Sequence, residues 1–328
     1  MKSNVTTKRQ TAQPVILISL FIGLLAVSFS AIFIEWSSAP SAVIGMYRLW
    51  MSVFLFLPFA LKRWHEFLKL TLRDVFLVCL SGIFLGLHFL FWIQSLKETS
   101  VASSMIIISL EPIFVLIGSV AIFHQKVTKT GILCMLCAII GCVVVASADF
   151  GKGGEHLWGD MLSLIGTLAV SLYMLTGQKV RGTVSGTTYN ALVFFVAGLV
   201  LFLFNIATKT PLWHYSGRNW LMFALLAVIS TVLGHGLFNW LLDTVSATTI
   251  SMTILGEPVG AIVLAYLLLG QPVVLLQGIG GILCLIGVFW FLRTHPSHQP
   301  NNEENPPSQE ANAADGRDRP EGFDASGA

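Results

Sequence analysis

Residues 101–123 read VASSMIIISLEPIFVLIGSVAIF, an apolar run interrupted near its middle by a Glu-Pro pair. A bilayer core about 30 Å thick requires about 20 apolar residues in one helix, so this run is long enough to cross a membrane. An ionised Arg, Lys or Asp at the centre of a membrane helix costs about 2.5–3.5 kcal/mol on insertion scales, so a buried acid there needs an explanation. The run therefore predicts a membrane-spanning helix that keeps Glu111 at mid-depth.

Similar apolar runs recur along the chain between clusters of charged and turn-forming residues. They predict an all-α membrane protein with ten transmembrane helices, at residues 14–34, 41–61, 74–96, 101–123, 130–148, 158–177, 187–207, 219–242, 246–269 and 273–293. Hydrophobic residues make up 55% of the chain and charged residues only 11%, whereas a soluble domain carries about 25% charged residues. This composition excludes a soluble enzyme, a nucleic-acid-binding protein and a disordered protein.

The basic residues predict how the spans are oriented. Twelve Lys and Arg side chains lie near the span ends on the side of the N-terminus, against four on the opposite side. Because cytoplasmic loops carry the excess of basic residues, we expect both termini in the cytoplasm and the protein in the inner or plasma membrane. Residues 1–13 are then a cytoplasmic segment, and residues 294–328, rich in acids, Pro and Asn, a disordered cytoplasmic tail.

Three short stretches recur in the same order in both halves of the chain. They are IGLLAVS at 22–28 with IGTLAVS at 165–171, HFLF at 88–91 with HGLF at 235–238, and Glu-Pro at 111–112 with Glu-Pro at 257–258. Each half holds five spans, an odd number, so the second half crosses the membrane in the opposite sense. A five-plus-five inverted repeat is a transporter architecture, in which the two halves rock around a site near the midplane.

This arrangement resembles the drug/metabolite transporter superfamily, and specifically EamA-type ten-helix transporters with two EamA domains. The local motifs are SLKETSVAS at 95–103, ahead of the first Glu-Pro pair, and LDTVSAT at 242–248, ahead of the second. The resemblance implies export of amino acids, metabolites or drug-like organic molecules, often by proton antiport. It also implies two domains, a first EamA-type repeat at 14–148 (spans 1–5) and a second at 149–293 (spans 6–10).

Glu111 and Glu257 are the leading candidates for a functional role. Both lie near the middle of a predicted span, where an inverted-repeat transporter keeps its site. Each is followed by a proline, Pro112 or Pro258, which removes a backbone donor and is expected to kink or break the helix. A buried carboxyl group can bind and release a proton, so both are candidates for proton coupling or substrate binding. The alternative is a structural Glu that is hydrogen-bonded to a neighbouring helix.

Arg48 is the basic residue that lies well inside a predicted span, about eight residues from its outer end. We expect it to face the interior of the bundle and to find an acid, with Glu111 and Glu257 as the candidates. Two roles remain open for it. Arg48 either clamps a substrate carboxylate or forms a fixed ion pair that holds spans together.

Polar and aromatic side chains recur together in spans 3 and 8. His88 and Trp92 are one turn apart and share a helix face, as do His235 and Asn239, with Trp240 beside them. Polar groups among aromatic surface suit a pocket for an organic molecule with an apolar body, whereas interhelical packing is the alternative. Weaker candidates of the same kind are Gln94, Tyr173, Gln178 and Asn190.

The sequence contains neither H-E-x-x-H nor a P-loop. Cys134-x-x-Cys137 has the spacing of a redox or metal pair, but nothing nearby supplies further ligands, and all five cysteines lie in apolar runs, where small residues pack. We therefore predict no enzyme activity, no catalytic residue, no metal, no cofactor and no nucleic-acid partner. The expected partners are a small-molecule substrate, protons and the lipid bilayer, and a homodimer is left open.

The leading hypothesis is a secondary transporter that exports a small organic metabolite, amino acid or drug-like molecule by proton-coupled alternating access. Two alternatives stay open. One is an uncoupled uniporter, and the other is a membrane sensor or enzyme that binds a small metabolite without transporting it.

Overall fold

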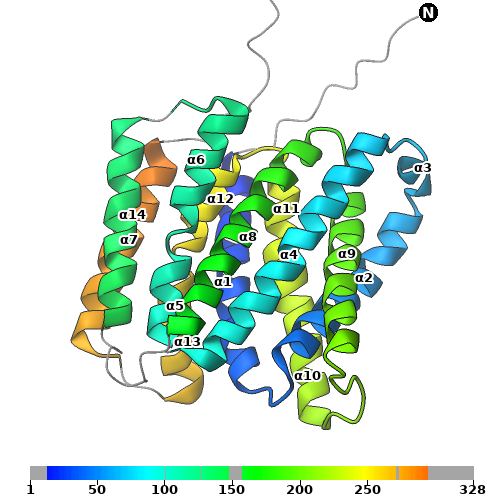
Figure 1. Ribbon diagram of the computed structural model, residues 1–328. Helices are drawn as coiled ribbons and strands as arrows, with labels where there is room; N and C mark the ends of the chain where they lie inside the picture. The colour runs from blue at the N-terminus through cyan, green and yellow to red at the C-terminus, as the bar shows by residue number, and fades with distance from the viewer. Residues whose placement is uncertain (1–12, 100, 127, 148–156, 271–272, 295–328) are drawn as a thin grey trace, which may run out of the picture.

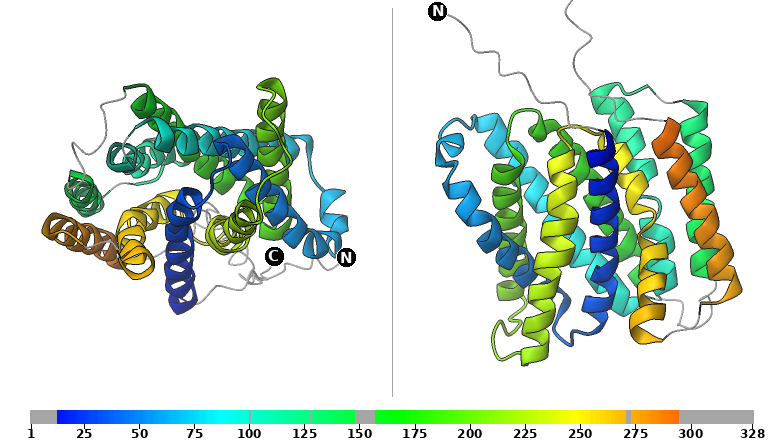
Figure 2. Two further views of the ribbon diagram at one scale, coloured as in Figure 1. Left: turned by 90° about the horizontal axis from the view of Figure 1, so that it is seen from below. Right: turned by 180° about the vertical axis from the view of Figure 1, so that it is seen from behind.

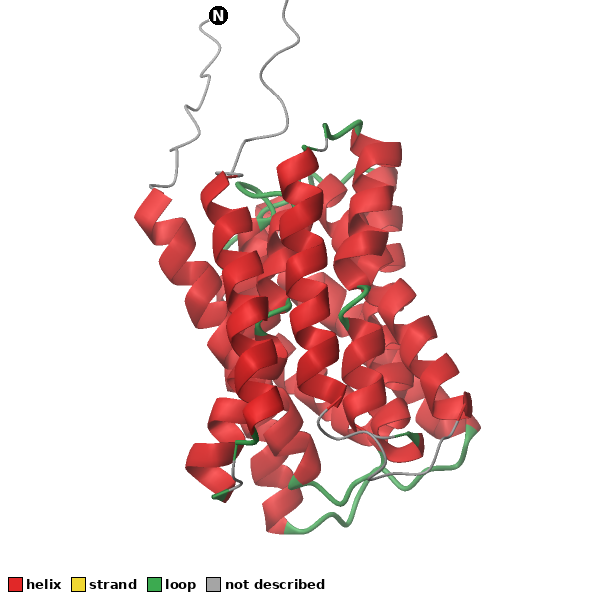
Figure 3. Cartoon of the chain, turned by 90° about the vertical axis from the view of Figure 1, so that its left-hand side faces the viewer, coloured by secondary structure: helices red, strands yellow, loops and turns green. Residues whose placement is uncertain are grey.

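The computed structural model describes residues 13–99, 101–126, 128–147, 157–270 and 273–294. Within these residues every regular element is a helix, and the helices stand side by side in one bundle (Figure 1). Figure 3 shows the loops gathered at the two ends of the bundle, apart from short interruptions inside it. The all-α prediction is confirmed for this part of the chain. The predicted N-terminal segment and acidic tail lie outside it, apart from Gln13 and Thr294.

The described residues of the first half form α1 (Gln13–Glu35), α2 (Ser41–Leu61), α3 (Trp64–Phe67), α4 (Leu72–Glu98), α5 (Val101–Ile108), α6 (Glu111–Phe123) and α7 (Lys129–Ser147). Those of the second half form α8 (Leu157–Arg181), α9 (Gly186–Ala207), α10 (Gly217–Leu225), the π-helix η1 (Leu226–Gly236), α11 (Leu237–Leu241), α12 (Ala247–Ile254), α13 (Glu257–Leu269) and α14 (Leu275–Thr294).

The ten predicted spans correspond to these helices to within a few residues. In the described part of the chain, nine segments are long and apolar enough to cross a membrane, and span 5 (α7) is a shorter apolar helix. The sequence-based prediction missed α3, because a helix of 4 residues is too short to show a hydrophobic period. It also missed that the middle of span 8 is a π-helix, which has no sequence signature of its own.

The two halves interlock through pairs of contacts between equivalent spans of the internal repeat. Span 3 (α4) packs along span 6 (α8), and span 8 (η1) packs along span 1 (α1). The right-hand view of Figure 2 shows α1, in blue, beside η1, in yellow-green. In the same way α4 packs on α9, and η1 packs on α2. Each half therefore completes its core with helices of the other half, as an inverted repeat requires.

Equivalent polar contacts join the two halves at the two ends of the bundle. At one end, Thr183 Oγ1 donates a hydrogen bond of 2.9 Å to Asp74 Oδ1. At the other end, Asn219 Nδ2 donates one of 3.1 Å to Ser38 Oγ. Asp74 and Asn219 both lie in the first turn of a span, spans 3 and 8 respectively, so the repeat extends to the loops that these residues contact.

Spans 5 and 10 (α7 and α14) cross with their backbones almost in contact. A Cβ atom added at Gly141 would lie 2.4 Å from the backbone nitrogen of Cys284, and one added at Gly287 would lie 2.6 Å from that of Ala138. No side chain fits at either position unless the helices move apart, which is why small residues mark membrane-helix crossings. The sulfur atoms of Cys142 and Cys284 lie 3.6 Å apart at this crossing, and both cysteines are free thiols.

The buried apolar side chains form two clusters. The larger cluster is built mainly from spans 1–3 and 6–8, and the smaller one from spans 5, 9 and 10, with side chains of span 4 packed against it. Span 9 contributes to both, because Ile250 belongs to the larger cluster and Met252 to the smaller one. Span 4 also contacts both, through Val115 and Ile113. The middle parts of spans 4 and 9 therefore lie at the boundary between two packed bodies.

Candidate functional site

Spans 4 and 9 are each broken at the Glu-Pro pair. Helix α5 ends at Ile108 and α6 begins at Glu111, while α12 ends at Ile254 and α13 begins at Glu257. The prolines follow directly, and a proline has no N–H to donate to the carbonyl four residues before it. Each span is therefore two half-helices, and each Glu is the first residue of the second half.

The two breaks meet around a single small cavity of about 20 Å³. Its lining consists of residues from both breaks, namely Ile108, Ser109, Glu111, Pro112, Ser251, Ile254, Leu255, Glu257 and Pro258. This volume holds about one water molecule, so an organic substrate requires the surrounding helices to move apart. Glu111 is only 3% exposed, and its Oε1 atom has no hydrogen-bond partner among the described residues. The structure thus brings Glu111 and Glu257 together at one place.

Arg48 of α2 is completely buried and is held by hydroxyl groups. Its Nε atom donates to Thr231 Oγ1 (3.0 Å), and Nη1 donates to Ser30 Oγ (3.1 Å). The guanidinium carbon lies 4.3 Å from the centre of the Phe89 ring, within the range of a cation–π interaction. Its Nη2 atom has no partner among the described residues.

The sequence-based expectation was that Arg48 pairs with Glu111 or Glu257. Among the described residues, the structure places neither carboxylate within 4.0 Å of the guanidinium group, although Glu257 is close enough to interact with it electrostatically. The physical reason is that hydroxyl groups of α1 and η1 occupy two of the guanidinium nitrogens. Ser30, Phe89 and Thr231 are therefore parts of the site that the sequence analysis missed.

The π-helix η1 shapes this site. Thr231 Oγ1 accepts from Arg48 and donates to the carbonyl of Leu226, five residues earlier, at 2.9 Å. A π-helical segment widens the helix and alters the direction of its side chains, and such segments occur frequently at functional sites. Here it carries both Thr231 and His235 towards the centre of the bundle.

The rings of His88 and His235 both contact Phe89, but their environments differ. His88 Nδ1 donates to the carbonyl of Gly166 (3.0 Å), and its ring stacks on Trp92 with the ring centres 5.7 Å apart. The ring of His235 meets Phe89 edge-on at 5.4 Å, and its Nδ1 atom has no partner among the described residues. The Trp92 Nε1 atom also lacks one. We call the set Arg48, His88, Phe89, Trp92 and His235 the aromatic–guanidinium cluster.

Asn239 and Trp240 do not join this cluster. Asn239 Nδ2 donates to Asn190 Oδ1 (2.7 Å), and Asn239 Oδ1 accepts a hydrogen bond from the Tyr173 hydroxyl. Asn190 Nδ2 in turn donates to the carbonyl of Gly236 (2.9 Å), so this network ties spans 6, 7 and 8 together. Trp240 is 42% exposed on the outside of the bundle. Neither residue lines the cavity between the two breaks, and their role in substrate binding stays a prediction.

The remaining weak candidates also have structural partners. Gln178 Oε1 accepts from the backbone N–H of Ala247 (2.6 Å), which caps the start of α12. Gln94 Nε2 donates to Glu98 Oε1 (2.8 Å) at the end of α4. Neither side chain lines the cavity between the two breaks.

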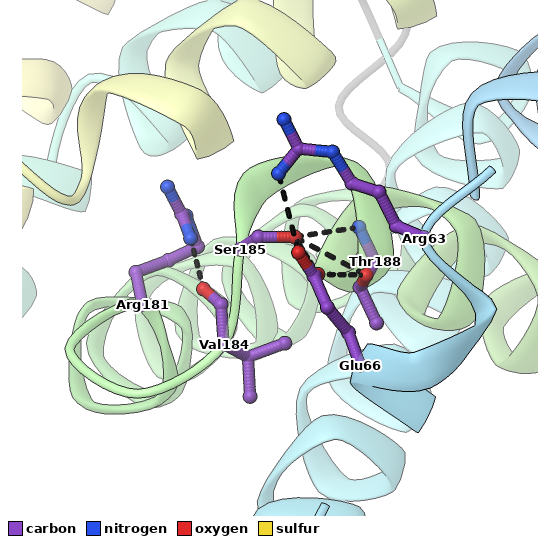
Figure 4. Close-up of polar contacts among 6 residues, drawn as sticks. All are labelled: Arg63, Glu66, Arg181, Val184, Ser185 and Thr188. Atoms are coloured by element: carbon purple, nitrogen blue, oxygen red, sulfur yellow. Dashed lines mark hydrogen bonds and ion pairs between the residues drawn. The ribbon is translucent and has the colours of Figure 1, made fainter. Parts of the chain in front are cut away.

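A second polar network, which the sequence analysis did not find, lies at the end of the bundle that carries α3 (Figure 4). Glu66 of α3 accepts hydrogen bonds from the hydroxyls of Ser185 and Thr188, at the start of α9, and from Arg63. Partial burial acts to raise the pKa of Glu66, but these three hydrogen bonds outweigh it and hold the pKa below its usual range. The carboxylate thus fixes α3 to the connection between α8 and α9, where Arg181 donates to the carbonyl of Val184.

Comparison with known proteins identifies the family. The EamA-like transporter family matches residues 14–147 and 157–293, which is most of the chain and both halves of the repeat. The chain belongs to the EamA-like transporter family. This confirms the predicted membership of the drug/metabolite transporter superfamily, and it establishes this EamA protein as a multi-pass membrane transporter.

Curated relatives of this EamA protein carry names that agree with the family. An uncharacterized transporter of Clostridium kluyveri is 25% identical over 82% of this chain and 90% of its own length. An uncharacterized transporter of Archaeoglobus fulgidus is 24% identical over 70% of this chain and 79% of its own length. A solved crystal structure covers 85% of this chain and 96% of its own, with a TM-score of 0.71 and 14% identity, which shows that the fold is shared.

Proposed function

We propose that this EamA protein is a secondary transporter that exports a small organic molecule and couples its movement to protons through Glu111 and Glu257. The observation that carries the proposal is that the two broken spans meet at one cavity and each contributes a carboxylate to it. Broken helices that meet inside an inverted repeat are where secondary transporters bind substrate and coupling ions.

The aromatic–guanidinium cluster supports an organic cargo. Arg48 Nη2, Trp92 Nε1 and His235 Nδ1 are buried nitrogens without a partner among the described residues. A polar group on a substrate would satisfy them, and the rings of Phe89 and Trp92 offer apolar surface for its body. The cluster and the cavity together carry one positive and two negative groups when all are ionised, which favours a cationic or zwitterionic cargo.

Alternating access requires two bodies that move against each other. The two buried apolar clusters support such a division, because the broken spans 4 and 9 lie where they meet. Movement at this boundary would open the small cavity towards one face of the membrane at a time. We also propose that the protein lies in the cell membrane with both termini in the cytoplasm, which the excess of basic residues at that end supports.

The test uses the purified full-length protein in liposomes that contain a pH-sensitive dye. Pools of amino acids, nucleosides and cationic drugs are added, and proton movement is followed. We expect at least one pool to move protons and the Glu257→Gln variant to abolish the signal, while Glu35→Gln, an exposed acid at the end of α1, retains it. Substrate flux that is independent of the pH gradient would instead identify a uniporter. Saturable binding without flux would identify a sensor, and chemical conversion of the compound an enzyme.

A further inference from the structure

Four residues that line the cavity between the broken helices have side-chain oxygens, the carboxylates of Glu111 and Glu257 and the hydroxyls of Ser109 and Ser251. Two further lining residues, Ile108 and Ile254, end a half-helix with their backbone carbonyls. Oxygen atoms of these three kinds are the ligands that hard cations such as Na⁺, Mg²⁺ and Ca²⁺ take in proteins. The composition of the lining therefore raises the question of whether it holds a cation.

The two serine hydroxyls are oriented so that their oxygens can accept. Ser109 Oγ donates its hydrogen to the carbonyl of Ile106 (2.6 Å), and Ser251 Oγ donates its own to the carbonyl of Thr248 (3.0 Å). Both residues are buried, at 2% and 1% exposure. Because each hydroxyl hydrogen is already bound to the backbone, the oxygen lone pairs remain for another partner, such as a cation.

The two prolines add a second source of oxygen ligands. In a continuous helix, residue 112 would donate its N–H to the carbonyl of Ile108, and residue 258 to that of Ile254. Pro112 and Pro258 cannot do so, which leaves each carbonyl without its usual helical donor. The C-terminal end of a half-helix also carries a partial negative charge, which attracts cations.

The net charge of the groups around the cavity favours a monovalent cation. Glu111 and Glu257 together contribute two negative charges when ionised, and Arg48, which interacts electrostatically with Glu257, contributes one positive charge. The remaining charge of −1 is balanced by one monovalent cation. Arg48 cannot fill this place itself, because its Nε and Nη1 atoms are bound to Thr231 and Ser30.

The size of the cavity and the types of side chain that line it narrow the choice of cation further. The cavity of about 20 Å³ has room for about one water molecule, and hence for a dehydrated alkali-metal ion but not for an organic ammonium group. The lining has two carboxylates and no His or Cys, and the described part of the chain has no cluster of three or more His, Cys, Asp or Glu side chains, so the cavity lacks the ligand set of a transition-metal ion. Glu111 lines this space, and its Oε1 atom is buried without a partner among the described residues, so a ligand would satisfy it.

We propose that this cavity is a binding site for an alkali-metal cation, with Na⁺ as the ion. The inference rests on the proposed coupling role of Glu111 and Glu257 and adds the identity of a second coupling ion. The titratable and charged neighbours of the pair are Arg48 on α2 and Tyr173 on α8, with His88 and His235 beyond Arg48.

Binding is tested with full-length protein in detergent, using radioactive Na⁺ as the probe and choline chloride to hold the ionic strength constant. We expect saturable binding of one Na⁺ per chain that excess NaCl displaces and choline does not. Absence of saturable binding to monodisperse protein overturns the proposal.

Variants test whether the cavity is the site. We expect Glu111→Gln to abolish binding, and Ser109→Ala and Ser251→Ala each to raise the Kd about tenfold or more, since each loses one ligand to a charged ion. The serine substitutions remove one oxygen each and keep the proposal testable independently of Glu111→Gln. Glu35→Gln should bind as the wild type does. Equal affinity in the wild type and both serine variants overturns the assignment to this cavity.

The measurement is independent of transport. Na⁺ binding at this site supports the inference even if no substrate pool moves protons, a result that would count against the proposed function alone. Conversely, proton-coupled transport in a protein that does not bind Na⁺ supports the proposed function and overturns this inference.

Discussion

Glu111 and Glu257 line one cavity, although they belong to different halves of the chain, and each is the first residue of a half-helix. The N-terminus of a helix carries a partial positive charge that stabilises a carboxylate, so α6 and α13 each offset part of the cost of burying these acids. The two carboxylates are not equivalent, however. Glu257 interacts electrostatically with Arg48, whereas Glu111 Oε1 has no hydrogen-bond partner among the described residues.

This difference predicts opposite effects of two matching substitutions on stability. At alkaline pH in Na⁺-free buffer, Glu111→Gln should raise the free energy of unfolding by about 1 kcal/mol, because it removes a buried acid that lacks a partner and repels its neighbour. Glu257→Gln should lower it by a similar amount, because Arg48 then loses its favourable acid. Thermal unfolding of the purified variants in detergent measures both, and shifts of the same sign would contradict the inequivalence of the two residues.

The two histidines predict a separation of stability from substrate affinity. His88 donates a hydrogen bond to Gly166 and stacks on Trp92, so His88→Ala should lower the free energy of unfolding by about 1.5–2.5 kcal/mol. His235 lacks such a hydrogen bond but keeps the edge-on contact with Phe89, so His235→Ala should lower the free energy of unfolding by less, about 0.5–1 kcal/mol. It should also raise the Kd of the transported compound. Thermal unfolding and ligand titration of both variants decide this, and equal losses of stability would argue that His235 is structural too.

Much of the fold was predictable, because each span is a long apolar run with charged or turn-forming ends. The two helix breaks were also predictable, because the sequence shows an acid followed by a proline, which has no N–H donor. What the sequence could not show is which side chains meet. Arg48 is bound by Ser30 and Thr231, two common hydroxyl residues that carry no motif, and the π-helix that positions Thr231 has no sequence signature.

Asn239 and Trp240 lie apart from His235 for a related reason. Helical periodicity placed Asn239 on the face of His235, but a π-helix precedes it, and its side chain instead meets Tyr173 and Asn190. The predicted role of Trp240 rested only on its position next to Asn239 in the chain, and its side chain is exposed on the outside of the bundle. A π-helical segment changes the direction of the side chains that follow it. A sequence pattern with a fixed helical period does not include this change.

Glu66 predicts how stability depends on pH at the end of the bundle that carries α3. Its hydrogen bonds from Ser185, Thr188 and Arg63 hold its pKa below the value of an unfolded chain. A lowered folded-state pKa contributes stability above the unfolded pKa, and this contribution is lost as the pH falls through the folded pKa. Wild type should therefore be more stable than Glu66→Gln at pH 7, and the difference should shrink below about pH 4.3.

Unfolding of both proteins in detergent from pH 7 to pH 3 measures this difference. Glu35→Gln, which changes an exposed acid at the far end of α1, serves as the control and should follow the wild type throughout. A difference between wild type and Glu66→Gln that stays constant over the whole range would show that the hydrogen-bonded carboxylate is not its source.

The crossing of α7 and α14 predicts opposite effects of two glycine substitutions on one helix. A Cβ atom at Gly280 would lie 2.6 Å from the backbone nitrogen of Val145, so Gly280→Ala should force the helices apart and cost about 1–3 kcal/mol. Gly278 lies two residues earlier with nothing within 4 Å, so Gly278→Ala should be neutral or stabilise the helix by up to about 1 kcal/mol. Thermal unfolding of the two variants compares the same chemical change at a closed and an open position. If both variants behave alike, the backbones at this crossing are not in contact, and the smaller apolar cluster then has to be held together by other contacts between spans 5 and 10.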